Sequence, residues 1–475
     1  MGAVAPPIQR RPVAAGTAPR GLAAVDAARG TFLSNPFSGV ELSPAYIAFC
    51  VYIFSIVTYR VPLGTASMVA AMVTLPLEKQ ALKVPPLALM MFALIGWAFV
   101  GMTTTSYPEV VIQAVTEFAK IGAVVFVAVN VLSTRARFRA FVVGATIAYC
   151  CFPVRGTLLA YFVYHGTMAG RATWNYIYSN PNDLAGLTIL ALSVALGALA
   201  VERRKWVKTG LTAGVGLMVV VIVLTQSRGA LIALVAFGII GGRKYLTDIR
   251  RLLMIGMLGV VVMMVAPDAV WKRMSSISMA TSQDESLFDP ELYDLATRAD
   301  QASSLQRLAI WEVARTIIAE NAITGVGLGA YPEVHNVTQR RPGFSWTARG
   351  KRDTHSTYLN IAAEMGLVGF AIFVSMIVHV LLYSRRARMK MQSRFPALAV
   401  QQFNLEVGLY GYLIAAIWGS YSGFIATYIH LVVMYTGAKL LEKESVGVAQ
   451  PVRRRGAAPV QAPNFTGRRR VGAIA

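Results

Sequence analysis

Three side chains in this sequence combine useful chemistry with positions beside long apolar runs. Arg228 closely precedes the apolar stretch 230–240, Arg307 lies in the longest polar segment, and His355 stands just before the apolar run that begins near Tyr358. A guanidinium group offers a fixed fork of N–H donors for phosphate oxygens, a geometry that lysine cannot match. An imidazole can accept the proton of a sugar or alcohol hydroxyl, which is too weak an acid to react unaided near neutral pH.

Each of these residues also has an ordinary structural explanation. An arginine at a membrane edge can extend its charged end to lipid headgroups or pair with a carboxylate, which would account for Arg228. Arg307 falls in the first turn of an expected helix, where it favours an anion but is also typical of a solvated surface charge. His355 can be a loop histidine that is satisfied by water. Taken alone, the residues leave both explanations open.

Four further residues are predicted to take secondary parts in the same site. Arg315 lies two helical turns beyond Arg307, and Asp353 stands beside His355. Asn182 and Asp183 follow Asn180-Pro181, a pattern that predicts a turn with Asp183 capping the next apolar span. The aromatic residues just before this turn are interpreted as an interfacial belt or as sugar-stacking surfaces; they are Trp174, Tyr176 and Tyr178.

The composition predicts a membrane protein. The 475 residues are 55% hydrophobic and only 14% charged, whereas soluble domains carry about 25% charged residues. Apolar runs of roughly 15–22 residues recur along the chain, which predicts an all-α, polytopic protein; a β-barrel would show short alternating segments instead. About twelve transmembrane helices are predicted, at 45–59, 63–77, 85–101, 110–131, 139–155, 184–201, 209–224, 229–241, 252–266, 357–383, 405–420 and 423–441.

The net charge of +22 is better explained by membrane topology than by nucleic-acid binding. The segment 267–356 holds nearly equal numbers of basic and acidic residues, while basic clusters fall in alternate connections and in both tails. With an even number of spans these clusters all face one side, which the positive-inside rule assigns to the cytoplasm. The opposite side then receives 102–109, 156–183, the turn at 226–228 and the long loop.

The chain therefore divides into five predicted parts: a basic, disordered cytoplasmic tail at 1–40, spans at 45–266, a periplasmic loop at 267–356, spans at 357–441 and a second disordered cytoplasmic tail at 445–475. Within the loop, Ser303-Ser304-Leu305-Gln306 is a capping-box pattern that predicts the start of an amphipathic helix of about fifteen residues. This helix is expected to lie at the membrane interface with Trp311 as an anchor and to end at the glycines 325, 327 and 329.

No cofactor or metal site is predicted. The three cysteines lie in apolar runs, and no Walker A, H-E-x-x-H or paired-cysteine spacing occurs. Gly325-Val326-Gly327-Leu328-Gly329-Ala330 matches a loose dinucleotide fingerprint, but it follows a helix and no βαβ unit surrounds it. A glycine turn that lets the backbone approach a membrane surface or ligand is the better interpretation.

Several of these stretches, taken together, resemble the O-antigen ligase/polymerase superfamily. The resemblance extends over about residues 45–440. It rests on Asn180-Pro181-Asn182-Asp183-Leu184-Ala185, Thr225-Gln226-Ser227-Arg228-Gly229-Ala230, Arg307 with Trp311, Thr324-Gly325-Val326-Gly327-Leu328-Gly329, His355-Ser356-Thr357-Tyr358-Leu359-Asn360, and Glu364 with Gly366-Leu367-Val368-Gly369.

The resemblance implies a glycosyltransferase of the bacterial inner membrane. Such enzymes move a glycan from undecaprenyl diphosphate to a glycan or lipid acceptor at the periplasmic face, without a nucleotide sugar or a metal. By this resemblance, Arg228 and Arg307 bind the diphosphate and His355 is the general base. Family members often read His-Asn where this chain has His355-Ser356, so a neighbouring amide is not available here.

The sequence thus predicts a ligase-type transferase, with polysaccharide polymerase and protein O-oligosaccharyltransferase as alternatives within the family. A transporter or flippase of lipid-linked sugars would use the same arginines for permeation, but its charges should lie near mid-span. A scaffold in an envelope assembly complex would make the arginines dispensable.

Overall fold

The computed structural model describes residue 37, residues 39–242 and residues 295–449. The predicted ninth span at 252–266, the first part of the long loop and most of both tails lie outside the described residues. The helices in chain order are α2 (Pro44–Thr58), α3 (Gly64–Thr74), α4 (Pro86–Gly101), α5 (Pro108–Val131), α6 (Arg135–Tyr149), α7 (Arg155–Phe162), α8 (Pro181–Val201), α9 (Lys205–Leu224), α10 (Arg228–Gly242), α13 (Leu295–Glu320), α14 (Tyr331–Thr338), α15 (Thr357–Met391), α16 (Pro396–Ala415) and α17 (Ile425–Ala449).

The described part of the chain is that of a multi-pass helical membrane protein. Every predicted span other than the ninth falls on a helix, and five helical segments are long and apolar enough to cross a bilayer. These are Pro108–Val131, Arg135–Phe162, Pro181–Val201, Lys205–Leu224 and Thr357–Met391. The small departure from an all-α fold is a hairpin of β1 (Thr167–Met168) and β2 (Arg171–Ala172), paired antiparallel. The total of about twelve spans stays a prediction.

Local sequence explains where many of the helices begin. Proline stands at the first position of α4, α5, α8 and α16, where its fixed φ suits a helix and its missing N–H costs nothing. The predicted fifth span is longer than expected, because a π-helical turn at Cys150–Val154 joins α6 to α7 around Pro153. Proline has no N–H to donate and clashes with the preceding turn of an α-helix, and the wider π-helical turn accommodates it without ending the helix.

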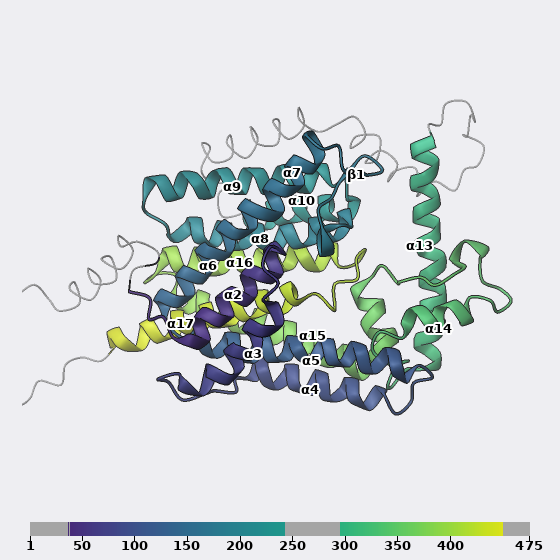
Figure 1. Cartoon of the computed structure of the whole chain (residues 1–475), viewed down its shortest axis with the longest axis horizontal. Helices are drawn as coiled ribbons and strands as arrows, with labels where there is room; N and C mark the ends of the chain where they lie inside the picture. Colours follow the sequence, from purple (N-terminus) through teal and green to yellow (C-terminus); the bar gives the residue numbers. More distant parts are fainter. Residues whose placement is uncertain (1–36, 38, 243–294, 450–475) are drawn as a thin grey trace, which may run out of the picture.

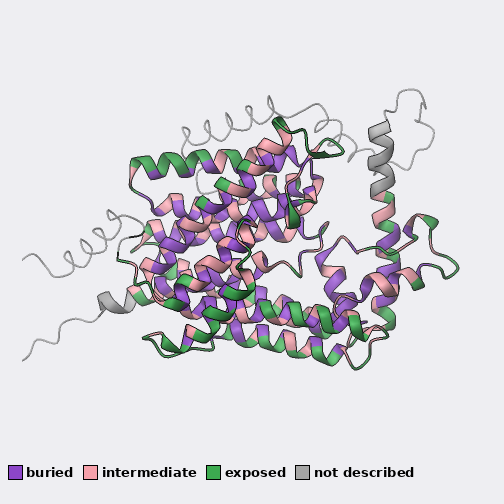
Figure 2. Cartoon of the chain, in the orientation of Figure 1, coloured by how far each residue is buried: buried purple, intermediate pink, exposed green. Residues whose placement is uncertain are grey.

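Figure 1 shows most helices lying side by side in one bundle, with α13 running crosswise at one end. The helices bury their facing sides and leave the outer faces of α3, α4 and α9 exposed, as Figure 2 shows. Many of the exposed side chains are large and apolar, including Val73, Leu77 and Trp206. Exposed apolar faces around a helical bundle are the surface that lipid chains contact.

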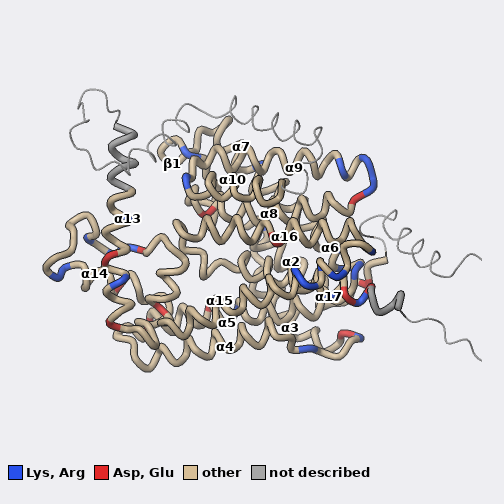
Figure 3. Tube along the Cα trace, turned by 180° about the vertical axis from the view of Figure 1, so that it is seen from behind, with Lys and Arg blue, Asp and Glu red and all other residues tan. Residues whose placement is uncertain are grey.

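The two ends of the bundle differ in charge. Figure 3 shows Lys and Arg gathered at one end, at the tips of α9 and α17, and mixed with acidic residues around α13 and α14 at the other. Four ion pairs connect separate segments at the basic end: Arg135–Glu444 at 2.8 Å, Arg137–Glu78 at 2.9 Å, Arg139–Glu202 at 3.1 Å and Arg388–Glu406 at 3.0 Å. At the opposite end, hydrogen bonds connect the segment 156–183, the turn at 226–228 and the long loop, which are all predicted to face the side away from the cytoplasm. The compartment that each end faces stays a prediction.

Two predicted helix starts are wrong. Helix α13 begins at Leu295, so Ser303-Ser304-Leu305-Gln306 lies inside the helix, which ends at Glu320 and not at the glycines. The local pattern misled because the hydroxyl of Ser304 serves a tertiary contact instead of a cap. Helix α8 is capped by Asn180, whose side chain accepts the Asn182 N–H at 2.9 Å, and not by Asp183. Asp183 lies in the first turn, where a carboxylate favours the helix dipole.

Helix α15 is interrupted at Gly366, whose φ of 65° is left-handed. The turn after α13 fills this break with backbone hydrogen bonds. Leu367 N–H donates to Ala322 O at 2.7 Å, and Val326 N–H donates to Ala363 O at 2.9 Å. A Cβ at position 366 would stand 2.0 Å from Ile323 O, so only glycine fits. The short helical piece 357–365 is thereby joined to the end of α13.

Candidate functional site

Arg228 opens α10, directly after a tight turn that follows α9. The three residues before it, Thr225, Gln226 and Ser227, are buried, and Gln226 holds a left-handed φ of 52°. Such a conformation costs energy in residues other than glycine and persists where the surroundings enforce it, often at functional sites. The half-buried Arg228 donates from Nη2 to Ser304 Oγ on α13 at 2.8 Å.

Arg307 lies one helical turn beyond Ser304 on the same helix, so α13 brings the two arginines to one place. The apolar side of α13 is buried, with Ile310, Val313 and Ile317 almost fully enclosed. On the same helix, Trp311 donates its indole N–H to Thr354 O at 2.9 Å. Trp311 therefore holds the loop that carries His355, a contact that the sequence does not reveal. The crosswise direction of α13 agrees with a helix that follows the membrane surface (Figure 1).

His355 is half-buried and adopts a left-handed φ of 49° just before α15. Burial lowers its pKa below the ordinary value of 6.5, the Asp353 carboxylate raises it, and the positive charges of Arg307 and Arg352 lower it. The balance leaves the imidazole neutral near pH 7, which is the form that accepts a proton. The influence of Arg307 also shows that this guanidinium lies near the ring.

Tyr421 connects the start of α8 to the start of α15. Its hydroxyl donates to Asn182 O at 3.0 Å, and its backbone N–H donates to Thr357 Oγ1 at 2.8 Å. Burial raises the Tyr421 pKa well above its usual value, the Asp183 carboxylate raises it further, and Arg307 lowers it. Asp183 and Arg307 therefore both lie near this buried ring.

Asp353 lies near both His355 and Tyr331 of α14. Its carboxylate accepts the Thr354 N–H at 2.8 Å. Burial raises the pKa of Tyr331 on α14, and the carboxylates of Asp353 and Glu364 raise it further. The Asp353 carboxylate is thus close to the His355 imidazole and to the Tyr331 ring. Arg315, by contrast, is exposed on α13, about 12 Å along the helix axis from Arg307 at 1.5 Å per residue.

Arg171 was not predicted, and it joins two of the motifs. From strand β2 it donates Nε to Thr225 O at 2.8 Å and Nη2 to Asn182 Oδ1 at 2.8 Å. In return, Gln226 Nε2 donates to Gly170 O at 3.0 Å. Arg171 belongs to the segment 156–183, which is predicted to face the same side as Arg228. An arginine on the side that the positive-inside rule disfavours is a signal that could have found it.

The geometry brings together Arg228, Arg307, His355, Asp353, Asn182 and Asp183 at one end of the bundle, and leaves Arg315 at its margin. Among residues 39–242 and 295–449, no three His, Cys, Asp or Glu side chains gather to form a metal site. The arrangement is suited to holding an anion beside a neutral base.

Residues 213–374 match the family model described as O-Antigen ligase. The matched region includes Arg228, Arg307 and His355 and ends within α15. No curated protein matches the chain. The match over residues 213–374 agrees with the motifs and supports membership of the O-antigen ligase/polymerase superfamily.

Proposed function

We propose that this protein is an O-antigen ligase-type glycosyltransferase, which moves a glycan from undecaprenyl diphosphate to an acceptor hydroxyl at the periplasmic face of the bacterial inner membrane. The observation that carries the proposal is the convergence of Arg228, Arg307 and His355 on one end of the bundle. Arg228 is fixed by Ser304, Arg307 follows one turn later, and Arg307 influences the charge of His355.

The chemistry follows from these groups. His355 accepts the acceptor's hydroxyl proton as that oxygen attacks the anomeric carbon, and the bond from this carbon to the diphosphate oxygen breaks. Guanidinium groups neutralise the charge that develops on the leaving diphosphate. Asp353 favours the protonated imidazole that results, and the proton then passes to solvent. Displacement from the opposite face predicts inversion at the anomeric carbon.

The test uses purified protein, a lipid-diphosphate-linked glycan and competing acceptors. A lipid core sugar, a second lipid-linked glycan and a protein side chain distinguish ligase, polymerase and protein O-oligosaccharyltransferase. We expect transfer to a lipid core sugar, and transfer that continues in EDTA. Loss of transfer that Mg²⁺ or Mn²⁺ restores would contradict the metal-independent mechanism, and absence of transfer to every acceptor would contradict the proposed function.

A transporter of lipid-linked sugars is the main alternative from another class. The broken helix α15 is a feature that transporters also show. Here, however, the break is filled by the segment 322–327 through backbone hydrogen bonds. The charged residues of the site lie at one end of the bundle and not midway along it. Both observations favour transfer at a membrane surface over passage through the bundle.

The pH dependence of kcat/KM should report the buried imidazole. His355 must be neutral to act as a base, and its pKa is below 6.5. The rate should therefore be level near neutral pH and fall on acidification with a midpoint below 6.5. In Asp353→Asn the carboxylate that raises this pKa is gone, so the acid limb should move to lower pH. A limb that moves to higher pH would contradict the assignment.

Arg171→Ala should reduce transfer by about ten- to a hundredfold, which corresponds to the loss of about one hydrogen bond to a charged group, roughly 1.5–3 kcal/mol. The substitution leaves Thr225 O and Asn182 Oδ1 without this donor and loosens the turn that presents Arg228. Steady-state kinetics of Arg171→Ala and Arg171→Lys measure the effect, with a melting curve for each. Full activity in the alanine variant would show that the turn holds its shape without Arg171.

A further inference from the structure

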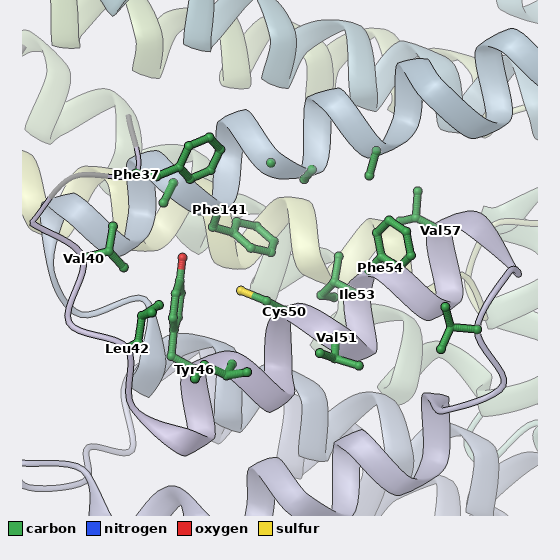
Figure 4. A pocket seen from close by; sticks show the side chains of 16 residues that line it. Phe37, Val40, Leu42, Tyr46, Cys50, Val51, Ile53, Phe54, Val57 and Phe141 are labelled. Carbon is green, nitrogen blue, oxygen red and sulfur yellow. The ribbon is translucent and has the colours of Figure 1, made fainter. Parts of the chain in front are cut away.

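A groove between α2 and α6 has a volume of about 810 Å³. We call it the α2–α6 groove. Figure 4 shows Phe37, Val40 and Leu42 at one end, Val57 at the other, and Phe141 on the facing helix. Its walls are almost entirely apolar.

The groove follows the length of a helix. Its lining runs from before the first residue of α2 to beyond its last, and 15 helical residues extend over about 22 Å. An apolar groove of this length suits an extended hydrocarbon chain better than a compact polar ligand, because it offers hardly any polar partners. The apolar walls therefore favour the hydrocarbon chain of a lipid as the ligand.

A second cavity of about 130 Å³ continues the groove towards the candidate site. The two cavities share Ile53, Val57, Phe141 and Ala145, and the second reaches Tyr178 and Ile425. The Tyr178 hydroxyl donates to Val57 O at 3.4 Å. The Tyr178 turn leads directly into Asn180, which caps α8. The apolar path thus ends next to the motif that contacts Arg171 and Tyr421.

Charge identifies the lipid. Beyond Tyr178, Asn182 binds Arg171, and Arg171 binds Thr225 at the turn that presents Arg228. An amphiphile with its chain in the groove would therefore have its head beside guanidinium groups, which match phosphate oxygens. A lipid with a phosphorylated head matches both the apolar groove and the guanidinium groups. An uncharged or cationic lipid matches only the groove.

We propose that the α2–α6 groove holds the hydrocarbon chain of the phosphorylated lipid donor. The proposal rests on the proposed function and adds to it a place for the lipid chain. Such a groove would let the protein select a long-chain carrier, which a site for the diphosphate head and the sugar alone would not do. Recognition of the chain is then separate in space from recognition of the head.

Gly144→Trp fills the groove with little disturbance of the fold, because a Cβ at position 144 meets only the exposed Phe37 ring, at 4.0 Å. Ile147→Trp is the matched control, since Ile147 lies on the same helix, is 48% exposed and does not line the groove. Transfer is measured with an undecaprenyl donor and a farnesyl donor that carry the same glycan. We expect Gly144→Trp to raise KM about tenfold for the undecaprenyl donor only, and Ile147→Trp to match the wild type.

The affinity for the lipid is a second measurement, and it does not depend on glycan transfer. Undecaprenyl phosphate is titrated into each purified protein in detergent, with phosphatidylglycerol as a competitor and melting curves as a check on folding. We expect weaker binding in Gly144→Trp only. Unchanged binding and KM in a folded Gly144→Trp would overturn the proposal, as would equal KM shifts for both donors or equal competition by phosphatidylglycerol. Absence of transfer by the wild type, with chain-dependent binding intact, would overturn the proposed function alone.

Discussion

Replacing Arg228 or Arg307 with alanine is expected to reduce glycan transfer about a thousandfold. Each substitution removes a guanidinium group from the place where the leaving diphosphate gains negative charge. Removing one such donor lowers the rate by about 10²–10³. The effect should be larger on kcat/KM than on protein yield, because neither side chain belongs to the buried apolar core. Initial rates with purified protein and saturating acceptor measure it.

Two further variants distinguish loss of the guanidinium group from loss of positive charge. Arg228→Lys keeps the charge but loses the planar fork, so it should recover only part of the activity. Arg340→Ala removes an exposed arginine near the same end and should leave transfer unchanged. Normal product from both Arg228→Ala and Arg307→Ala would exclude a diphosphate-binding role, whereas loss in Arg340→Ala would indicate a general effect of charge.

Replacing His355 is expected to lower transfer by about 10²–10⁴, the usual contribution of a general base. The left-handed backbone at this position makes His355→Asn the better substitution, because asparagine tolerates that conformation more readily than most residues. Donor binding should survive in this variant, since the guanidinium groups remain. Rates and donor affinity of the folded variant are measured side by side.

The outcome also separates the base from a structural role. If His355 only shaped the loop, His355→Asn would change stability and donor affinity together with rate. A variant with normal melting behaviour, normal donor binding and normal transfer would contradict the assignment of His355 as the base.

The sequence predicted the helices well because apolar length and charge placement are local properties of a membrane segment. It predicted less well where a side chain has two uses. Ser304 is part of a capping pattern, but tertiary structure uses its hydroxyl for Arg228. Asp183 and Asn180 are both good caps, and only backbone geometry shows that Asn180 is the cap.

The site was predicted through residues that stand beside apolar runs, and its supporting contacts were not. Arg171 and Tyr421 act through hydrogen bonds to residues far away in the sequence, which no local pattern specifies. Trp311 was predicted as a membrane anchor, yet its indole N–H binds the loop before His355. Long-range contacts of this kind decide how precisely a site is held, and they become visible only in three dimensions.

The interruption of α15 at Gly366 has a mechanical consequence. The piece 357–365, which follows His355, is tied by backbone hydrogen bonds to the turn that ends α13, and α13 carries Arg307. The inner part of α15 is tied to the same turn, since Leu367 N–H donates to Ala322 O. His355, the proposed base, and Arg307, a proposed phosphate-binding residue, are therefore held by one hydrogen-bonded unit, and a movement of this unit to admit a bulky glycan would preserve the spacing between them.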